Sequence, residues 1–120
     1  MLTKEEMKAW FQSIWFDIRG ASTRDGHPAP YPVELAERLI RMFSFAGDTV
    51  LDPFAGTGST SQAAILSGRN SIANEIEPLY VEIARRRIAQ AAREPRVFGA
   101  TEAEVILDKA TRAAGLPVVN

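Results

Sequence analysis

Residues 49–60 read Thr-Val-Leu-Asp-Pro-Phe-Ala-Gly-Thr-Gly-Ser-Thr, and this stretch decides the fold. An apolar run ends in Asp52, the chain turns through Gly56 and Gly58, and hydroxyl residues and an alanine-rich segment follow. This order predicts a buried strand, a tight glycine turn and the start of a helix. Open α/β sheets hold nucleotide-like ligands at such turns, because glycines let the backbone approach the ligand closely.

A second acidic residue strengthens this interpretation. Glu75 closes the next apolar run, Ser71-Ile72-Ala73-Asn74, near the spacing at which a carboxylate meets ribose hydroxyls in such folds. A Gly-x-Gly alone is a weak signal, but the strand, turn, helix and second strand ending in an acid support one another. If Glu75 serves a ribose only, Glu75→Gln is expected to weaken ligand binding with little loss of stability.

Helical spacing and turn residues predict the remaining elements. We expect an amphipathic helix from residue 4 to about 15, a helix opened by Pro32 and a strand over residues 71–75. Further helices are expected after the glycine turn, from Pro78, and from a second capping box at residues 101–104.

Some conspicuous side chains have a structural interpretation. Trp10 and Trp15 accompany other apolar residues at helical spacing, which favours core packing over base stacking. The run Arg85-Arg86-Arg87 is typical of a solvated helix face with one capping or packing role. His27 precedes prolines in a turn-rich loop, where a structural role is favoured over ligand contact.

Composition limits the class of protein. With 120 residues and 46% hydrophobic residues, the chain is expected to form a single soluble domain, residues 1–120. It has no apolar stretch of membrane-spanning length, no signal-peptide pattern and no cysteine, as expected of a cytoplasmic protein. One histidine argues against a zinc site, and a net charge of −1 argues against tight DNA binding by this chain alone.

From His27 to about Ile88 the chain resembles the cofactor-binding half of the S-adenosylmethionine-dependent DNA amino-methyltransferases. These bacterial and phage enzymes methylate adenine N6 or cytosine N4. Residues 52–60 resemble their cofactor loop, and residues 68–80 resemble their second strand with its ribose-binding acid. Residues 27–40 resemble the segment that lines the methionine end of the cofactor, which precedes the glycine loop in one order class of the family.

The resemblance implies a partial Rossmann-like methyltransferase fold of class α/β, with parallel strands and flanking helices, and S-adenosyl-L-methionine as cofactor. Asp52 would pair with the methionine ammonium, Glu75 would accept hydrogen bonds from the ribose hydroxyls, and Ile76 would offer an apolar surface to the adenine. The expected cofactor-binding residues are Pro28, Ala29, Asp52, Pro53, Phe54, Ala55, Gly56, Thr57, Gly58, Thr60, Glu75 and Ile76.

The sequence departs from the family at its catalytic motif. That motif is Asp, Asn or Ser, then Pro-Pro, then Tyr or Phe, and this chain has no Pro-Pro pair. Glu77-Pro78-Leu79-Tyr80 imitates it, but lies where the family has an ordinary helix start. In this order class the motif lies upstream. We therefore expect no catalytic residue here, and a chain that is the carboxy-terminal portion of a methyltransferase or one subunit of a split one.

The expected partners follow from the same comparison. DNA would be contacted mainly through the missing portion or a partner chain. A two-stranded sheet is marginal alone and its open edge tends to find a partner, so a homo-oligomer or a second subunit is expected, without a membrane partner. The resemblance implies a cytoplasmic protein of bacterial or phage-like origin.

Three alternatives compete with this interpretation. A phosphate-binding nucleotide loop is excluded because no lysine follows the glycines. In a nicotinamide-binding Rossmann domain the third glycine would fall at Ser61, and Asp52-Pro53-Phe54 before the turn is unusual. A non-catalytic cofactor- or partner-binding module, left from or regulating a split methyltransferase, stays open. So does the methylated base, with a slight preference for adenine.

Overall fold

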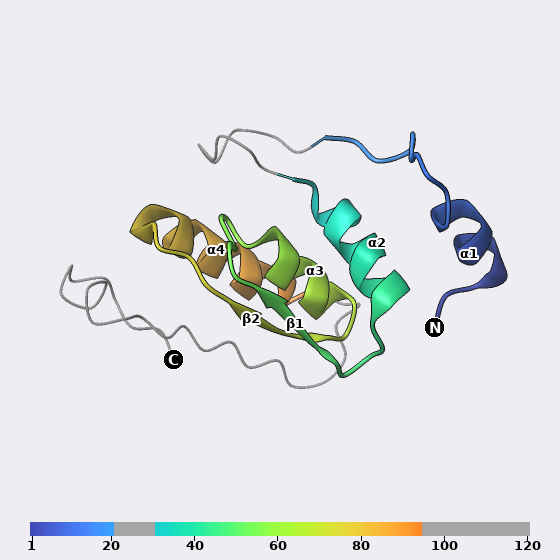
Figure 1. The fold of residues 1–120 in the computed structure, drawn as a ribbon. Coiled ribbons are helices and arrows are strands. Elements are labelled where there is room, and N and C mark those ends of the chain that lie inside the picture. Colours follow the sequence, from blue (N-terminus) through green and yellow to red (C-terminus); the bar gives the residue numbers. More distant parts are fainter. Residues whose placement is uncertain (21–30, 95–120) are drawn as a thin grey trace.

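Helices flank a pair of parallel strands in the computed structural model, which describes residues 1–20 and 31–94 (Figure 1). The strands pair from Thr49↔Asn70 to Asp52↔Ala73. The elements in chain order are α1 (Lys4–Trp10), α2 (Val33–Phe43), β1 (Thr49–Asp52), α3 (Ser59–Leu66), β2 (Asn70–Ala73) and α4 (Pro78–Ala91). The predicted α/β class, with a helix crossing between two parallel strands, is confirmed for these residues.

The core lies between α3, α2 and one face of the strand pair. α3 contacts both strands and also packs against α2 and α4. A buried cluster of Ala36, Ile40, Ala63 and Ala64 receives Val50 from β1. Because the α3 members of this cluster are alanines, the helix can lie close to the sheet and to its neighbours at the same time.

The opposite face of the strand pair is bare in the described part of the chain. Leu51 and Ile72 are register partners, so their side chains share this face, and they are 63% and 58% exposed. In Figure 1 the strands lie in front of α3 and α4, with no helix on their near side. Parallel sheets are normally covered on both faces, so residues 1–20 and 31–94 supply only one of the two layers.

The first helix is shorter than expected. The predicted capping box is confirmed, because Thr3 Oγ1 accepts from the Glu6 amide and Glu6 accepts from the Thr3 amide. However, α1 ends at Trp10 instead of continuing to about residue 15. The indole N–H of Trp15 donates to the Trp10 carbonyl at 2.8 Å, so a side chain satisfies a carbonyl that a longer helix would have paired.

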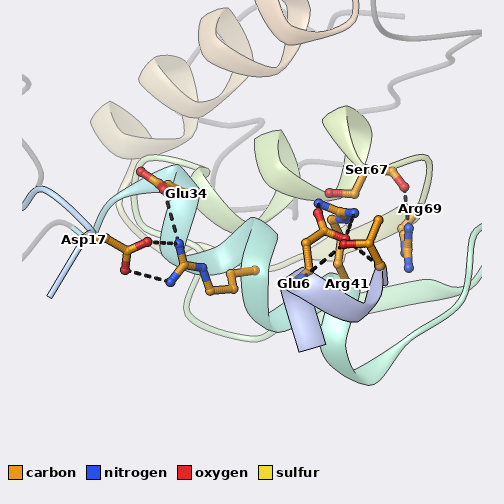
Figure 2. Close-up of polar contacts among 8 residues, drawn as sticks. Glu6, Asp17, Glu34, Arg41, Ser67 and Arg69 are labelled. Atoms are coloured by element: carbon orange, nitrogen blue, oxygen red, sulfur yellow. Dashed lines mark hydrogen bonds and ion pairs between the residues drawn. The ribbon is translucent and has the colours of Figure 1, made fainter. Parts of the chain in front are cut away.

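The two tryptophans contact a buried cation and are not core residues. The Arg38 guanidinium of α2 lies 5.0 Å from the Trp10 ring centroid and 4.9 Å from that of Trp15. It donates to both Asp17 oxygens at 3.0 and 2.9 Å, and Glu34 lies 3.5 Å away (Figure 2). These hydrogen bonds hold the pKa of Asp17 below its usual value. Both rings are partly buried and contact this arginine, which is itself 5% exposed, so they have a packing role without being fully buried core residues.

Two further arginines connect segments that are distant in sequence (Figure 2). Arg41 of α2 pairs with Glu6 of α1 at 2.8 Å. Arg69 donates to the Ser44 carbonyl at 2.8 Å and to the Ser67 carbonyl at 2.6 Å, which joins the ends of α2 and α3. The chain is therefore held together by arginine contacts where its small apolar core does not reach.

Some predictions fall outside the described residues. These are the helix predicted from the capping box at 101–104 and the roles of Pro28 and Ala29. β2 covers residues 70–73, one position earlier at its start than the predicted strand, so Glu75 lies two residues beyond the strand end. Within residues 1–20 and 31–94, no helix has the length and apolar character needed to cross a membrane.

Candidate cofactor-binding site

The glycine turn joins β1 to α3. Gly56 and Gly58 have φ values of 55° and 86°, in the left-handed region that side-chain-bearing residues rarely adopt. The Gly58 amide donates to the Ala55 carbonyl, and the Ala55 amide donates across to the Asn74 carbonyl, both at 2.9 Å. The predicted tight glycine turn is confirmed, and the close approach of a ligand to it stays a prediction.

Gly58 is also where α4 packs against the turn. A Cβ built at this position would lie 2.8 Å from the Ala84 Cβ and 3.1 Å from its Cα. Both distances are shorter than ordinary Cβ contacts. Gly58 is thus required for close packing of a helix behind the turn, in addition to any approach of a ligand in front of it.

Arg87, one turn after Ala84 on α4, holds the same turn by hydrogen bonds. Its guanidinium donates to the Thr57 carbonyl at 3.0 Å, to Thr57 Oγ1 at 2.7 Å and to Ser59 Oγ at 3.2 Å. Thr57 and Ser59 are both buried. Arg87 therefore has the packing role expected for one of the three consecutive arginines, and Arg85 and Arg86 both pair with Glu82, Arg86 being the exposed one of the three.

Glu75, two residues beyond β2, contacts the glycine turn. Its Oε2 accepts from the Gly56 amide at 2.7 Å, and its Oε1 accepts from the Ile76 and Glu77 amides at 2.9 Å each. The carboxylate therefore fixes the turn as well as facing the site. The expectation that Glu75→Gln leaves stability nearly unchanged does not fit these contacts, since an amide cannot accept at both positions.

Asp52, at the end of β1, is held from two sides. Its Oδ1 accepts from the Phe54 amide at 3.0 Å, and its Oδ2 accepts from the Tyr31 hydroxyl at 3.2 Å. The Tyr31 hydroxyl also forms a hydrogen bond with Thr60 Oγ1. Burial raises the pKa of Tyr31, the hydrogen bond from Thr60 opposes this, and the Asp52 charge adds to it, so the hydroxyl keeps its proton at neutral pH.

Exposed apolar side chains follow both strands at this edge of the sheet. Phe54, in the turn after β1, is 86% exposed, and Ile76, shortly after β2, is 93% exposed. The carboxyl ends of parallel strands meet at one edge, which is where such sheets bind ligands. Exposed apolar groups next to two carboxylates offer contacts to a ligand with both a ring and polar groups.

The predicted site residues fall into distinct groups. Asp52, Thr60 and Glu75 are partly buried, and Pro53, Phe54 and Ile76 are exposed. Ala55, Gly56, Thr57 and Gly58 are buried and form the frame of the turn. Sequence reasoning missed Tyr31 and Arg87 as members of this site. Tyr31 lies in the segment 27–32 already singled out, but no spacing rule connects its hydroxyl to Asp52.

Four backbone amides of residues 54–58 are paired within the protein. In dinucleotide sites such amides are free to bind pyrophosphate oxygens. The paired donors and their acceptors are Phe54 with Asp52, Ala55 with Asn74, Gly56 with Glu75, and Gly58 with Ala55. Two of these acceptors are carboxylates, which would repel a phosphate. The two carboxylates can accept from the hydroxyl groups of a ligand or pair with a cation.

Comparison with protein families gives a match to the family described as DNA methylase, over residues 2–86. The chain is 47% identical over 90 residues to the Type II methyltransferase M.MthZI of Methanothermobacter thermautotrophicus, covering 70% of this chain and 25% of that protein. It is 43% identical over 68 residues to the DNA adenine methyltransferase YhdJ of Escherichia coli K12, covering 57% of this chain and 23% of that one.

Among solved structures, the chain is similar to TTHA0409 of Thermus thermophilus, described as a DNA modification methylase in complex with S-adenosyl-L-methionine. The TM-score is 0.68 and the sequence identity 49%, over 77% of this chain and 35% of that one. The cofactor named for that structure is the one predicted from the residues of the glycine turn. The chain spans about a quarter of the length of the two methyltransferases compared above.

Proposed function

Because this chain belongs to the DNA methylase family, we propose that residues 1–120 form a single domain that binds S-adenosyl-L-methionine. This domain would be the cofactor-binding part of a cytoplasmic enzyme that transfers a methyl group to an exocyclic amino group in DNA. Adenine is the favoured base, supported by the similarity to YhdJ, which is described as a DNA adenine methyltransferase.

The observation that carries the proposal is the pairing of four glycine-turn amides, two of them with the Asp52 and Glu75 carboxylates. S-adenosylmethionine carries an ammonium, a sulfonium, a carboxylate and ribose hydroxyls, but no phosphate. Its ammonium and ribose hydroxyls need acceptors, which the two carboxylates of this turn provide. Asp52 would pair with the ammonium. Glu75 would accept from the ribose hydroxyls at Oε2, where the Gly56 amide leaves one lone pair free, because the Ile76 and Glu77 amides occupy both lone pairs of Oε1.

The remaining contacts would be apolar. Phe54 and Ile76 are the exposed apolar side chains of the two post-strand loops, and they would lie against the adenine ring. Pro28 and Ala29, by resemblance, would line the methionine moiety. Gly56 and Gly58 would keep the turn beneath the cofactor free of side chains.

The chemistry of methyl transfer needs groups that this chain lacks. The methyl carbon must be held in line with an amino nitrogen in a site without water, and the target base must be turned out of the duplex. A Pro-Pro motif that would hold such a base is absent from the sequence. We assign to this chain the binding and orientation of the cofactor, and to another segment or chain the binding of the base.

A dialysis experiment tests both parts of the proposal at once. The chain is dialysed against methyl-labelled S-adenosylmethionine, and duplex or single-stranded DNA is then added. We expect label to be retained by the protein and none to be transferred to DNA above background. No retained label would contradict the cofactor assignment. Transfer to DNA would show that catalytic residues lie in this chain, with Glu77-Pro78-Leu79-Tyr80 the first to be replaced.

The bare sheet face supports the proposal of a partner. Leu51 and Ile72 form an apolar surface, and β1 has an unpaired outer edge in the described sheet. We expect the isolated chain to self-associate in sedimentation velocity, and Leu51→Lys to return it to a monomer. The control is Phe16→Lys, which removes an exposed apolar side chain far from the strands in sequence and should leave association unchanged. A monomeric wild-type chain would contradict self-association and leave a different subunit as the proposed partner.

The alternative is a non-catalytic module that binds the cofactor or a partner and regulates a separate enzyme. The absent Pro-Pro motif favours it for the isolated chain. The two proposals differ in the effect of adding the remainder of a methyltransferase. If this chain is the cofactor-binding part, a catalytic half should transfer methyl groups only when this chain is present. If this chain is a regulatory module, the separate enzyme should be active alone and this chain should only change its rate.

A further inference from the structure

The Tyr31 hydroxyl connects three parts of the chain that lie far apart in sequence. Tyr31 stands just before α2, Asp52 ends β1, and Thr60 is in the first turn of α3. The hydroxyl donates to Asp52 Oδ2 at 3.2 Å and shares a hydrogen bond with Thr60 Oγ1. The ring packs against the buried cluster of α2 and α3, so its position is set by the core.

The direction of these hydrogen bonds follows from counting protons. A tyrosine hydroxyl has one hydrogen, and an ionised carboxylate can only accept. The hydrogen of Tyr31 therefore goes to Asp52, and the Thr60 hydroxyl donates its own hydrogen to the Tyr31 oxygen. The chain of donors runs from Thr60 through Tyr31 to Asp52 and ends on the carboxylate.

The other carboxylate oxygen is fixed as well. Asp52 Oδ1 accepts from the Phe54 amide at 3.0 Å, so the backbone of the turn and the Tyr31 hydroxyl each hold one oxygen. A carboxylate held at both oxygens has a defined plane, and its remaining lone pairs point in defined directions. Without Tyr31 the group would be held at one oxygen only and could rotate about its Cβ–Cγ bond.

We propose that Tyr31 is a positioning residue that orients Asp52 toward the ammonium group of the cofactor's methionine moiety. This inference rests on the proposed function, because it assumes that Asp52 meets that ammonium. It predicts that the hydroxyl of Tyr31 matters for ligands that carry the amino-acid moiety and not for ligands that lack it. A merely structural tyrosine would affect both kinds of ligand equally.

Two ligands separate these possibilities. S-adenosylhomocysteine carries the ammonium and carboxylate, and 5′-methylthioadenosine keeps the adenosine and lacks both. Calorimetry with Tyr31→Phe should show about tenfold weaker binding of S-adenosylhomocysteine, as expected for one lost hydrogen bond to a charged group. The affinity for 5′-methylthioadenosine should change by less than about twofold. The ring is kept, so the melting temperature reports whether the core is intact.

The second tyrosine provides a matched control. Tyr80→Phe removes the same hydroxyl from α4 and should leave both affinities unchanged. Equal weakening of both ligands by Tyr31→Phe, or no change in either, would overturn the positioning role while leaving the cofactor site in place. Failure of the wild-type chain to bind either ligand would instead contradict the proposed function, and this inference with it.

Discussion

Gly58→Ala is expected to lower the free energy of unfolding by about 2–4 kcal/mol and to abolish measurable cofactor binding. Two costs combine at this position. Gly58 has a φ of 86°, where a Cβ is strained, and the new Cβ would lie 2.8 Å from that of Ala84. Relief requires α4 to move away from the turn. Chemical denaturation measures the loss of stability, and calorimetry measures the loss of binding.

Gly47 separates the two costs. It has nearly the same φ, 88°, but a Cβ built there meets no atom within 4 Å. Gly47→Ala should therefore cost only the conformational strain, about 1–2 kcal/mol, and leave cofactor affinity unchanged. The double variant Gly58→Ala with Ala84→Gly should recover part of the stability, since it removes the closest contact. Equal losses for Gly58→Ala and Gly47→Ala would show that packing of α4 does not constrain the turn.

Much of the site could be predicted because its geometry is local or follows from the parallel strand order. The glycine turn is a continuous segment, so its left-handed residues follow directly from the positions of the glycines. Glu75 was predicted from its spacing to meet a ribose, which stays a prediction. In the structure it follows the strand parallel to β1 and contacts the Gly56 amide. Pro78 was predicted to open a helix, and α4 begins there.

The contacts that sequence reasoning missed are made by long side chains between distant elements. Arg87 reaches Thr57 and Ser59 from another helix, and nothing in a run of three arginines shows which one turns inward. The Arg38 guanidinium lies about equally close to the rings of Trp10 and Trp15, a contact that their spacing did not predict. Periodicity predicts which face of a helix is apolar, but it does not predict which cation another segment will supply.

Glu75→Gln is expected to lower the affinity for S-adenosylmethionine by one to two decades, because a hydrogen bond to a charged acceptor contributes roughly 1.5–3 kcal/mol. The apo protein should also lose stability, since the carboxylate accepts from three backbone amides. Glu77→Gln is the matched control. That neighbouring carboxylate accepts only from the Leu79 amide, at 3.3 Å among the described contacts, and its replacement should leave cofactor affinity unchanged.

The most direct test of the cofactor assignment is a calorimetric titration of the wild-type chain with S-adenosylmethionine and, separately, with NAD. The paired amides of the glycine turn and the carboxylates of Asp52 and Glu75 predict binding of S-adenosylmethionine and no measurable response to the pyrophosphate-bearing NAD. Binding of NAD without any response to S-adenosylmethionine would contradict the account.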